Sequence, residues 1–217
     1  MENHKIKEFF ISSIMNWGSE NYRTFPWRES SNPYHFLVVE FLLQKTKAEQ
    51  VIEIYEKFIQ NYSSIEALAN SDLDQLNFLL NPLGLYYRGQ RLKETAYQIL
   101  NQFNGIIPNK EDDLITIKGI GKYIARAILC FGFNYKTSIL DVNIGRIFIR
   151  FFNLDEPKRI RDSKKLWEFS DWILPVKNFR YFNFYLLDFG SKICQKRNPK
   201  CDECLLSCNC FYFINKI

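Results

Sequence analysis

The stretch of sequence that decides the fold is Asp112–Ala127, which reads Asp-Asp-Leu-Ile-Thr-Ile-Lys-Gly-Ile-Gly-Lys-Tyr-Ile-Ala-Arg-Ala. It predicts a helical segment that ends at Lys118, a turn that contains Gly119 and Gly121, and a second helix that begins near Lys122. The two glycines permit positive φ and a close approach of a partner to the backbone. Backbone N–H groups at the start of the second helix then point at an anion site, beside the charge of Lys122. This arrangement is typical of a helix-hairpin-helix that binds a DNA phosphate.

The remainder of the chain shows the same helical periodicity. Apolar residues recur at helical spacing in five further segments: 51–59, 73–80, 92–103, 144–151 and 166–174. We expect Ser71 to cap the segment that begins at Leu73. We expect Asn104-Gly105 to end the segment 92–103. No long alternating pattern indicates a strand. The sequence therefore predicts an all-α protein of about ten helices with short loops.

Composition limits the class of protein. Of the 217 residues 47% are hydrophobic and 17% aromatic, enough for the core of one large or two small domains. The net charge of +5 is a mild basic bias, which would favour a polyanion only if it were concentrated on one face. The charged N-terminus lacks the apolar segment of a signal peptide, and no apolar run is long enough for a membrane span. We expect a cytoplasmic monomer with no membrane association, whose cysteines are thiols or metal ligands.

Four cysteines close to the C-terminus suggest a metal site. They have the spacing C-x6-C-x2-C-x5-C, at Cys194, Cys201, Cys204 and Cys210. Structural zinc sites usually have two close pairs and this tail has one, so the spacing favours an iron–sulfur cluster while zinc stays open. Cys208 is a possible substitute ligand. Cys130 lies in an apolar run, where we expect it to be part of the core.

A basic loop lies between the first two of these cysteines. It carries Lys196, Arg197 and Lys200 on a segment that a metal would hold at both ends. Such a loop loses little entropy when it meets a phosphate, so we predict contacts with a nucleic-acid backbone. The alternative is an ordinary solvated loop.

Asp141 follows the hairpin in the sequence Leu140-Asp-Val-Asn143 and opens the next predicted helix. Its simplest role is that of a helix N-cap. A carboxylate in this position stays ionised because the helix dipole stabilises it. An ionised Asp141 beside a flipped nucleotide could also stabilise positive charge on the sugar and orient water.

Together these motifs resemble the helix-hairpin-helix glycosylases of the endonuclease III superfamily. Segments in the N-terminal half are similar to its mismatch branch, which contains the MutY adenine glycosylases and the archaeal-type thymine–DNA mismatch glycosylases: Phe25–Arg28, Pro33-Tyr34, Glu40–Thr46 and Leu83–Arg88. The resemblance runs from about Phe25 to Cys210. It implies base excision from double-stranded DNA with a mismatched or damaged base, at the nucleoid, and a [4Fe-4S] cluster on the four cysteines. It also implies a two-lobed fold, with a six-helix domain at 29–137 and a cluster domain from 1–28 and 138–217.

Tyr123 bears on the type of reaction. Bifunctional members of the superfamily carry a nucleophilic lysine two residues after the second hairpin glycine, where this chain has Tyr123. Lys122 lies one place earlier and should point in another direction, because successive helical residues are about 100° apart. We therefore expect a monofunctional glycosylase that uses water and leaves an abasic site. Tyrosine here resembles the thymine mismatch enzymes, although Tyr123 could merely pack.

The segment Glu40–Arg88 supplies the other candidate residues. Glu40 interrupts a wholly apolar run, so burial would raise its pKa and make it a candidate proton donor, unless it forms a structural salt bridge. The resemblance places Gln44, Lys45 and Tyr86 where side chains fill the gap left by a flipped nucleotide, with Arg88 also in the DNA-binding set. Lys118 departs from the family, in which proline usually precedes the hairpin.

Several functions stay open at this point. The first is removal of thymine or uracil opposite guanine, and the second is removal of adenine opposite 8-oxoguanine or guanine. The adenine enzymes usually carry a further C-terminal domain, so the end of this chain at Ile217 led us to favour the first. A modified base in foreign DNA is a third possibility. A non-catalytic iron–sulfur DNA-binding or redox-sensing protein is a fourth, but it would need neither Asp141 nor Glu40.

Overall fold

The computed structural model describes residues 2–84 and 87–215, and every regular element in these two ranges is helical. The prediction of an all-α protein is confirmed. The chain forms two compact units. We call residues 24–135 the continuous unit, and residues 1–23 with 136–217 the discontinuous unit. From the resemblance we had expected divisions at 29 and 137.

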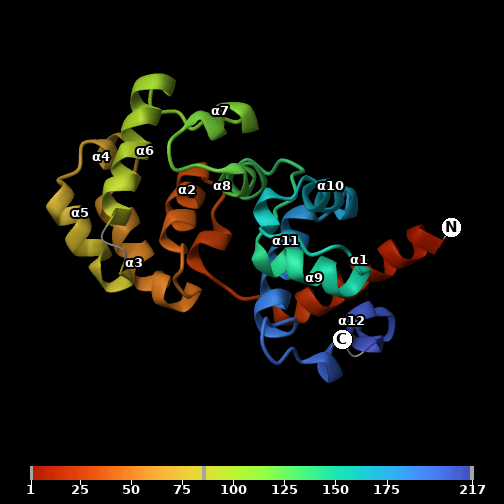
Figure 1. The fold of residues 1–217 in the computed structure, drawn as a ribbon. Coiled ribbons are helices and arrows are strands. Elements are labelled where there is room, and N and C mark those ends of the chain that lie inside the picture. The colour runs from red at the N-terminus through yellow and green to blue at the C-terminus, as the bar shows by residue number, and fades with distance from the viewer. Residues whose placement is uncertain (1, 85–86, 216–217) are drawn as a thin grey trace. The chain divides into compact units, whose positions relative to one another are not determined.

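The continuous unit is built around a buried helix, α2 (Pro33–Leu42), in which every residue from Phe36 to Leu42 is buried. It packs against α3, α6, α8 and the π-helical turn Ile128–Gly132. Figure 1 shows α6 running alongside α4 and α5. The helices of this unit are α2, α3 (Ala48–Asn61), α4 (Ile65–Ala69), α5 (Leu73–Leu80), α6 (Tyr87–Phe103), α7 (Glu111–Thr116) and α8 (Lys122–Ala127), with 3₁₀ turns at Pro26–Glu29 and Asn81–Leu83.

The discontinuous unit brings the first helix against a late one. It contains α1 (Glu2–Asn21), α9 (Val142–Phe152), α10 (Lys164–Ile173), α11 (Phe179–Lys192) and α12 (Phe211–Ile214), with 3₁₀ turns at Ile160–Asp162, Cys201–Glu203 and Ser207–Asn209. α1 packs along α11, and a Cβ at Gly18 would lie 2.0 Å from the Tyr185 ring, so only glycine allows this approach. The fully buried Phe10 ring packs on Phe151 at 5.1 Å, and Trp17 packs edge-on against Phe189.

A buried ion pair also ties the start of the chain to α11. The Nε of Arg23 lies 2.6 Å from Oδ1 of Asp188, a side chain with no exposed surface. The Arg23 backbone N–H donates to the other carboxylate oxygen at 3.1 Å. Because Asp188 is buried, its charge depends on such contacts, and breaking a buried ion pair typically costs about 3–5 kcal/mol.

Two local predictions were wrong. The N-cap of α5 is Asp72, whose carboxylate accepts from the Gln75 N–H at 2.9 Å. Ser71 is buried instead, and its hydroxyl donates to the Leu68 carbonyl at the end of α4. The first hairpin helix ends at Thr116 and not at Lys118, because Ile117 adopts an extended conformation.

Other local predictions are confirmed. Asn104 and Gly105 both have positive φ directly after α6, and Cys130 is fully buried. None of the helices in the described ranges combines the length and the apolar character that a membrane span requires.

Candidate active site

The hairpin turn lies between α7 and α8 of the continuous unit. Gly119 has φ +95°, and a Cβ there would lie 3.0 Å from Phe41 and 3.1 Å from the Thr95 hydroxyl. Gly121 is the N-cap residue of α8, and a Cβ at Gly121 would meet nothing within 4 Å. Gly119 is therefore required by conformation and space, whereas Gly121 is open to a partner. Lys122 is exposed beside it, as expected for a residue that meets a phosphate.

Side chains of α6 hold the hairpin turn from its buried side. The Thr95 hydroxyl is 2.9 Å from the Lys118 carbonyl and 2.8 Å from the Arg91 carbonyl. Gln98 accepts from the Lys118 N–H at 2.8 Å, a bond that proline could not make. The Lys118 ammonium pairs with Glu94 at 2.8 Å. The departure from the family at Lys118 is thus accommodated by residues of α6.

The same helix holds the loop that follows α2. Gln44 is half-buried and Lys45 is exposed with φ +56°. The Arg88 guanidinium donates to the carbonyls of Leu42 at 2.9 Å and Gln44 at 2.8 Å, and to the Thr46 hydroxyl at 3.0 Å.

The predicted DNA contact of Arg88 requires correction. Its side chain is 2% exposed and its donors are directed at the loop, so it positions Gln44 and Lys45 and does not present a cation to DNA. Tyr86, the other residue of this motif assigned to DNA, lies outside the described residues.

Two of the predicted catalytic residues lie in the continuous unit. Glu40 is 8% exposed, in the last turn of α2 among buried apolar neighbours. Tyr123 is the second residue of α8 and is half-buried. The structure thus bears out the expected burial of Glu40, and it places Tyr123 on the helix that begins at the hairpin.

Asp141 is the N-cap of α9 in the discontinuous unit. Its Oδ1 accepts from the backbone N–H groups of Asn143 at 2.9 Å and Ile144 at 2.8 Å, and its Oδ2 accepts from the Asn143 amide at 2.9 Å. Burial raises the pKa of Asp141, while these hydrogen bonds and the Arg161 charge act in the opposite direction. We had considered only the stabilising effect of the helix N-terminus, whereas burial is the larger influence.

Asn143 and Arg146 connect Asp141 to the cysteine segment. The side-chain Oδ1 of Asn143 accepts from Arg146 Nη2 at 3.0 Å, and Arg146 Nε donates to the backbone carbonyl of Cys194 at 2.8 Å. A third bond joins Arg146 to the Gly190 carbonyl. Sequence reasoning missed this function of α9, although arginines four residues apart, at 146 and 150, in an otherwise apolar helix were a visible signal.

The four predicted cysteine ligands gather around α9. Cys194 accepts from the Arg150 guanidinium at 3.6 Å, and the Cys210 thiol donates to the Arg150 carbonyl at 3.6 Å. Burial is the main reason that the pKa of Cys204 rises to about 12, and the nearby Cys194, Cys210 and Cys201 raise it further. The exposed Cys208 is not among these neighbours. Within the described ranges no three His, Cys, Asp or Glu side chains converge on a point where they could hold a single metal ion.

The basic loop of the tail is fixed through its backbone. Arg150 donates to the carbonyls of Gln195 at 2.7 Å and Lys196 at 3.2 Å. Lys196, Arg197 and Lys200 are exposed, and the Lys200 ammonium lies 3.4 Å from Glu203. Arg150 thus fixes the loop backbone, while the three cations of the loop are exposed.

Residues 38–170 match the HhH-GPD superfamily of base excision DNA repair proteins, a range that contains the second half of α2, the hairpin and Asp141. The chain belongs to this superfamily. Its HhH-GPD region spans parts of both units, so neither unit alone contains the whole family sequence.

Relatives within the HhH-GPD superfamily fall into two groups. The chain is 32% identical to the thymine/uracil-DNA glycosylase of Methanothermobacter thermautotrophicus, over 97% of this chain and 96% of that protein. It is 39% identical to the adenine DNA glycosylase of Buchnera aphidicola subsp. Baizongia pistaciae, over 95% of this chain but only 59% of that protein.

Solved structures agree with this assignment. A thermostable thymine-DNA glycosylase superposes with a TM-score of 0.94 at 31% identity, covering 99% of this chain and 100% of the other. A trapped endonuclease III–DNA covalent intermediate superposes with a TM-score of 0.81 at 16% identity, over 97% of this chain and 98% of the other. The second likeness shows the HhH-GPD fold alone.

Proposed function

We propose that this chain is a monofunctional DNA glycosylase that removes thymine or uracil opposite guanine in double-stranded DNA. The observation that carries the proposal is Tyr123 at the start of α8, where lyase-type relatives carry a nucleophilic lysine. The neighbouring Lys122 is exposed on another side of the helix and cannot replace it without a change of backbone. The likeness to thymine/uracil-DNA glycosylases over nearly their whole length supports the choice of base.

Asp141 and Glu40 would divide the chemistry. Glu40, buried in α2, would donate a proton to the leaving base. Asp141, as the carboxylate, would stabilise the positive charge that develops on the sugar and orient the attacking water. Asn143 fixes the Asp141 oxygens through two hydrogen bonds.

The hairpin and the α2–α3 loop would bind the DNA. Gly119, Gly121 and Lys122 would hold one phosphate through backbone N–H groups and charge. Gln44 and Lys45, on the loop that Arg88 fixes, would enter the gap left by the flipped nucleotide. Extrusion costs a few kcal/mol, and a side chain in the gap offsets part of this.

We also propose a [4Fe-4S] cluster on Cys194, Cys201, Cys204 and Cys210. The donor set fits, because four free thiols lie within electrostatic reach of one another, and burial raises the pKa of three of them, Cys201, Cys204 and Cys210, which penalises their bare thiolates. Bound iron would compensate these charges. The cluster would supply structural support to the tail, where Lys196, Arg197 and Lys200 would contact the DNA backbone.

A second candidate function is removal of adenine opposite 8-oxoguanine or guanine, which the 39% identity to an adenine DNA glycosylase favours. One experiment separates the two. Labelled duplexes with T·G, U·G, A·8-oxoguanine or A·G pairs are incubated with the protein and then treated with alkali. We expect breaks in T·G and U·G duplexes only after alkali. Cleavage of the adenine duplexes alone would contradict the choice of base, and breaks before alkali would contradict monofunctional chemistry.

A further inference from the structure

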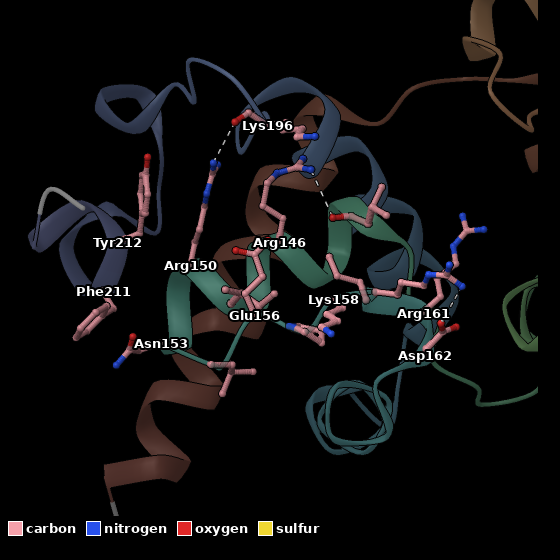
Figure 2. Close-up of a pocket in the computed structure, with 16 residues that line it drawn as sticks. Arg146, Arg150, Asn153, Glu156, Lys158, Arg161, Asp162, Lys196, Phe211 and Tyr212 are labelled. Atoms are coloured by element: carbon pink, nitrogen blue, oxygen red, sulfur yellow. Dashed lines mark hydrogen bonds and ion pairs between the residues drawn. The ribbon is translucent and has the colours of Figure 1, made fainter.

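A wide groove of about 1070 Å³ follows one face of α9 in the discontinuous unit (Figure 2). α9 contributes Val142, Arg146, Ile149 and Arg150, whose spacing places them on a single side of the helix, and its C-cap residue Asn153 also lines the groove. The other walls are the segment 154–162, Lys196 and the C-terminal aromatic residues 211 and 212.

Most of the excess charge of the chain lines this groove. Six cations and two carboxylates give the lining a net charge of +4, against +5 for all 217 residues. The charged residues are Arg146, Arg150, Lys158, Arg159, Arg161 and Lys196 against Glu156 and Asp162. The concentration of charge that we required for a polyanion-binding protein is therefore present on this surface.

The inner arginines are fixed by the protein itself. Arg146 and Arg150 donate to carbonyls of the segment 190–196, and the Arg150 guanidinium lies 4.6 Å from the centre of the Tyr212 ring. Arg146 and Arg150 therefore hold two positive charges at fixed positions along the inner wall of the groove. In the close-up of Figure 2 their side chains extend from α9 towards this segment.

The outer cations are available to a ligand. The exposed amino groups of Lys158 and Lys196 make no hydrogen bond or ion pair within the part of the chain that the structure describes. Arg159 pairs with Asp162 only at 3.8 Å, with 84% of its side chain exposed. Exposed pairs of this kind are weak because water and salt screen them, so a phosphate can displace the carboxylate.

The groove begins where the candidate catalytic carboxylate lies. Val142 lines its end and directly follows Asp141, and the charge of Arg161 acts on the Asp141 carboxylate. The eleven residues of α9 extend about 16 Å, which equals about four or five base-pair steps measured along the axis of a duplex. A strand with one nucleotide at Asp141 would bring its next phosphates to this face.

We propose that the groove binds the DNA backbone on one side of the excised nucleotide. The position of the DNA strand along the groove rests on the proposed function, because this position assumes that the flipped sugar lies at Asp141. Lys158, Arg159, Arg161 and Lys196 would contact phosphates in turn, and the half-buried aromatic residues 211 and 212 would limit the far end of the groove.

Salt dependence of DNA binding provides the first test. The variant Lys158→Ala/Arg159→Ala removes two outer cations. The control Lys164→Ala/Lys165→Ala removes two cations that are 90% and 89% exposed in the same unit but do not line the groove. We expect the slope of log K against log salt to decrease by about 1.8 in the first variant, at about 0.9 per phosphate contact, and to stay at the wild-type value in the control.

Duplexes shortened on one side of a T·G pair provide the second test. On a long duplex the groove variant should bind more weakly than the wild type. This difference should vanish when the flank on one particular side is shortened to a single base pair, and persist when the other flank is shortened. An unchanged salt slope, an equal loss in the control, or a difference that survives both truncations would overturn the proposal.

These outcomes differ from a failure of the proposed function. Excision by the wild-type protein reports on the function, whereas salt slopes on a plain duplex report on the groove alone. If no duplex were cut and the groove variant still showed a smaller salt slope, the groove would be confirmed as a DNA-binding surface. The position of the strand relative to Asp141 would then be wrong. Melting temperatures of both variants should equal that of the wild type, since substitutions of exposed side chains rarely change stability.

Discussion

At the scale of single residues, Asp141 combines a contact that stabilises the fold with a buried charge that destabilises it. It caps α9 through two backbone N–H groups, and it is buried where its charge is penalised. Asparagine is an equally good N-cap and has almost the same shape. The cap and the charge can therefore be separated by one substitution.

We predict that Asp141→Asn abolishes excision and leaves the fold as stable as before or more so. Burial raises the pKa of Asp141 above its ordinary value of 3.8. At a pH between 3.8 and the raised pKa, Asp141 is protonated in the folded state and ionised in the unfolded state. The free energy of unfolding therefore falls as pH rises through this range, and it stays lower at higher pH. Asparagine does not titrate, and the variant should gain stability relative to the wild type at neutral pH but not at acid pH.

Thermal unfolding at several pH values, together with single-turnover excision, measures both effects. Wild-type activity should fall as pH decreases through the raised pKa, because the carboxylate form is needed. A variant that lost stability at every pH would show that Asp141 is chiefly structural.

We predict that Tyr123→Lys introduces strand-cleaving activity. The new amine would lie at the start of α8, where lyase-type relatives carry their nucleophile, and could form a covalent adduct with the sugar. Borohydride should then trap a protein–DNA complex with the variant and not with the wild type. Lys122→Ala in the same background is the control, and loss of the adduct in that variant would identify Lys122 as the nucleophile.

At the scale of elements, α6 holds two loops of the continuous unit. Arg88, close to its start, fixes the loop that contains Gln44, and Thr95 and Gln98 fix the hairpin turn. The separation of these contacts along one rigid helix sets the distance between the two predicted DNA-binding loops. α6 is thus a positioning element that itself offers no catalytic group.

We predict that Thr95→Val weakens DNA binding and lowers stability by about 0.5–1.5 kcal/mol, because it removes the hydrogen bond from the buried Thr95 hydroxyl to the Lys118 carbonyl. Thr95→Ser retains the hydroxyl and is the matched control for that bond. Binding to an undamaged duplex and denaturant unfolding give the two readouts. Equal losses in both variants would show that packing of the methyl group, rather than the hydrogen bond, decides the effect.

Much at this scale was predictable from the sequence, and the failures have physical causes. The helices at 48–61, 87–103 and 142–152 follow apolar periodicity, and the cap at Asp141 follows residue preference. The burial of Arg88 was not predictable, because its partners lie more than forty residues away in the sequence. The groove on α9 was equally hidden, since its walls come from three separate segments and its cations look like ordinary surface charge.

At the scale of the whole molecule, the tail gathers four thiols, and burial raises the pKa of three of them, Cys201, Cys204 and Cys210. We predict that Cys204→Ser lowers the iron content from roughly four per chain to near zero and reduces the melting temperature. Cys208→Ser changes an exposed cysteine of the same tail and should keep both values. Metal analysis and absorbance spectra of the purified variants measure the effect, and full iron content in the Cys204 variant would remove it from the ligand set.

The pairing of α1 with α11 has a consequence for how the molecule is made. On a ribosome that adds about 5–20 residues per second, α1 emerges on the order of ten seconds before the helix that covers it. During that interval Phe10, Ile14 and Trp17, all buried in the finished protein, have no permanent partner. The continuous unit emerges completely in the meantime, because it consists of the consecutive residues 24–135. The nascent chain should therefore fold from its middle outward and be most in need of chaperone protection at its beginning.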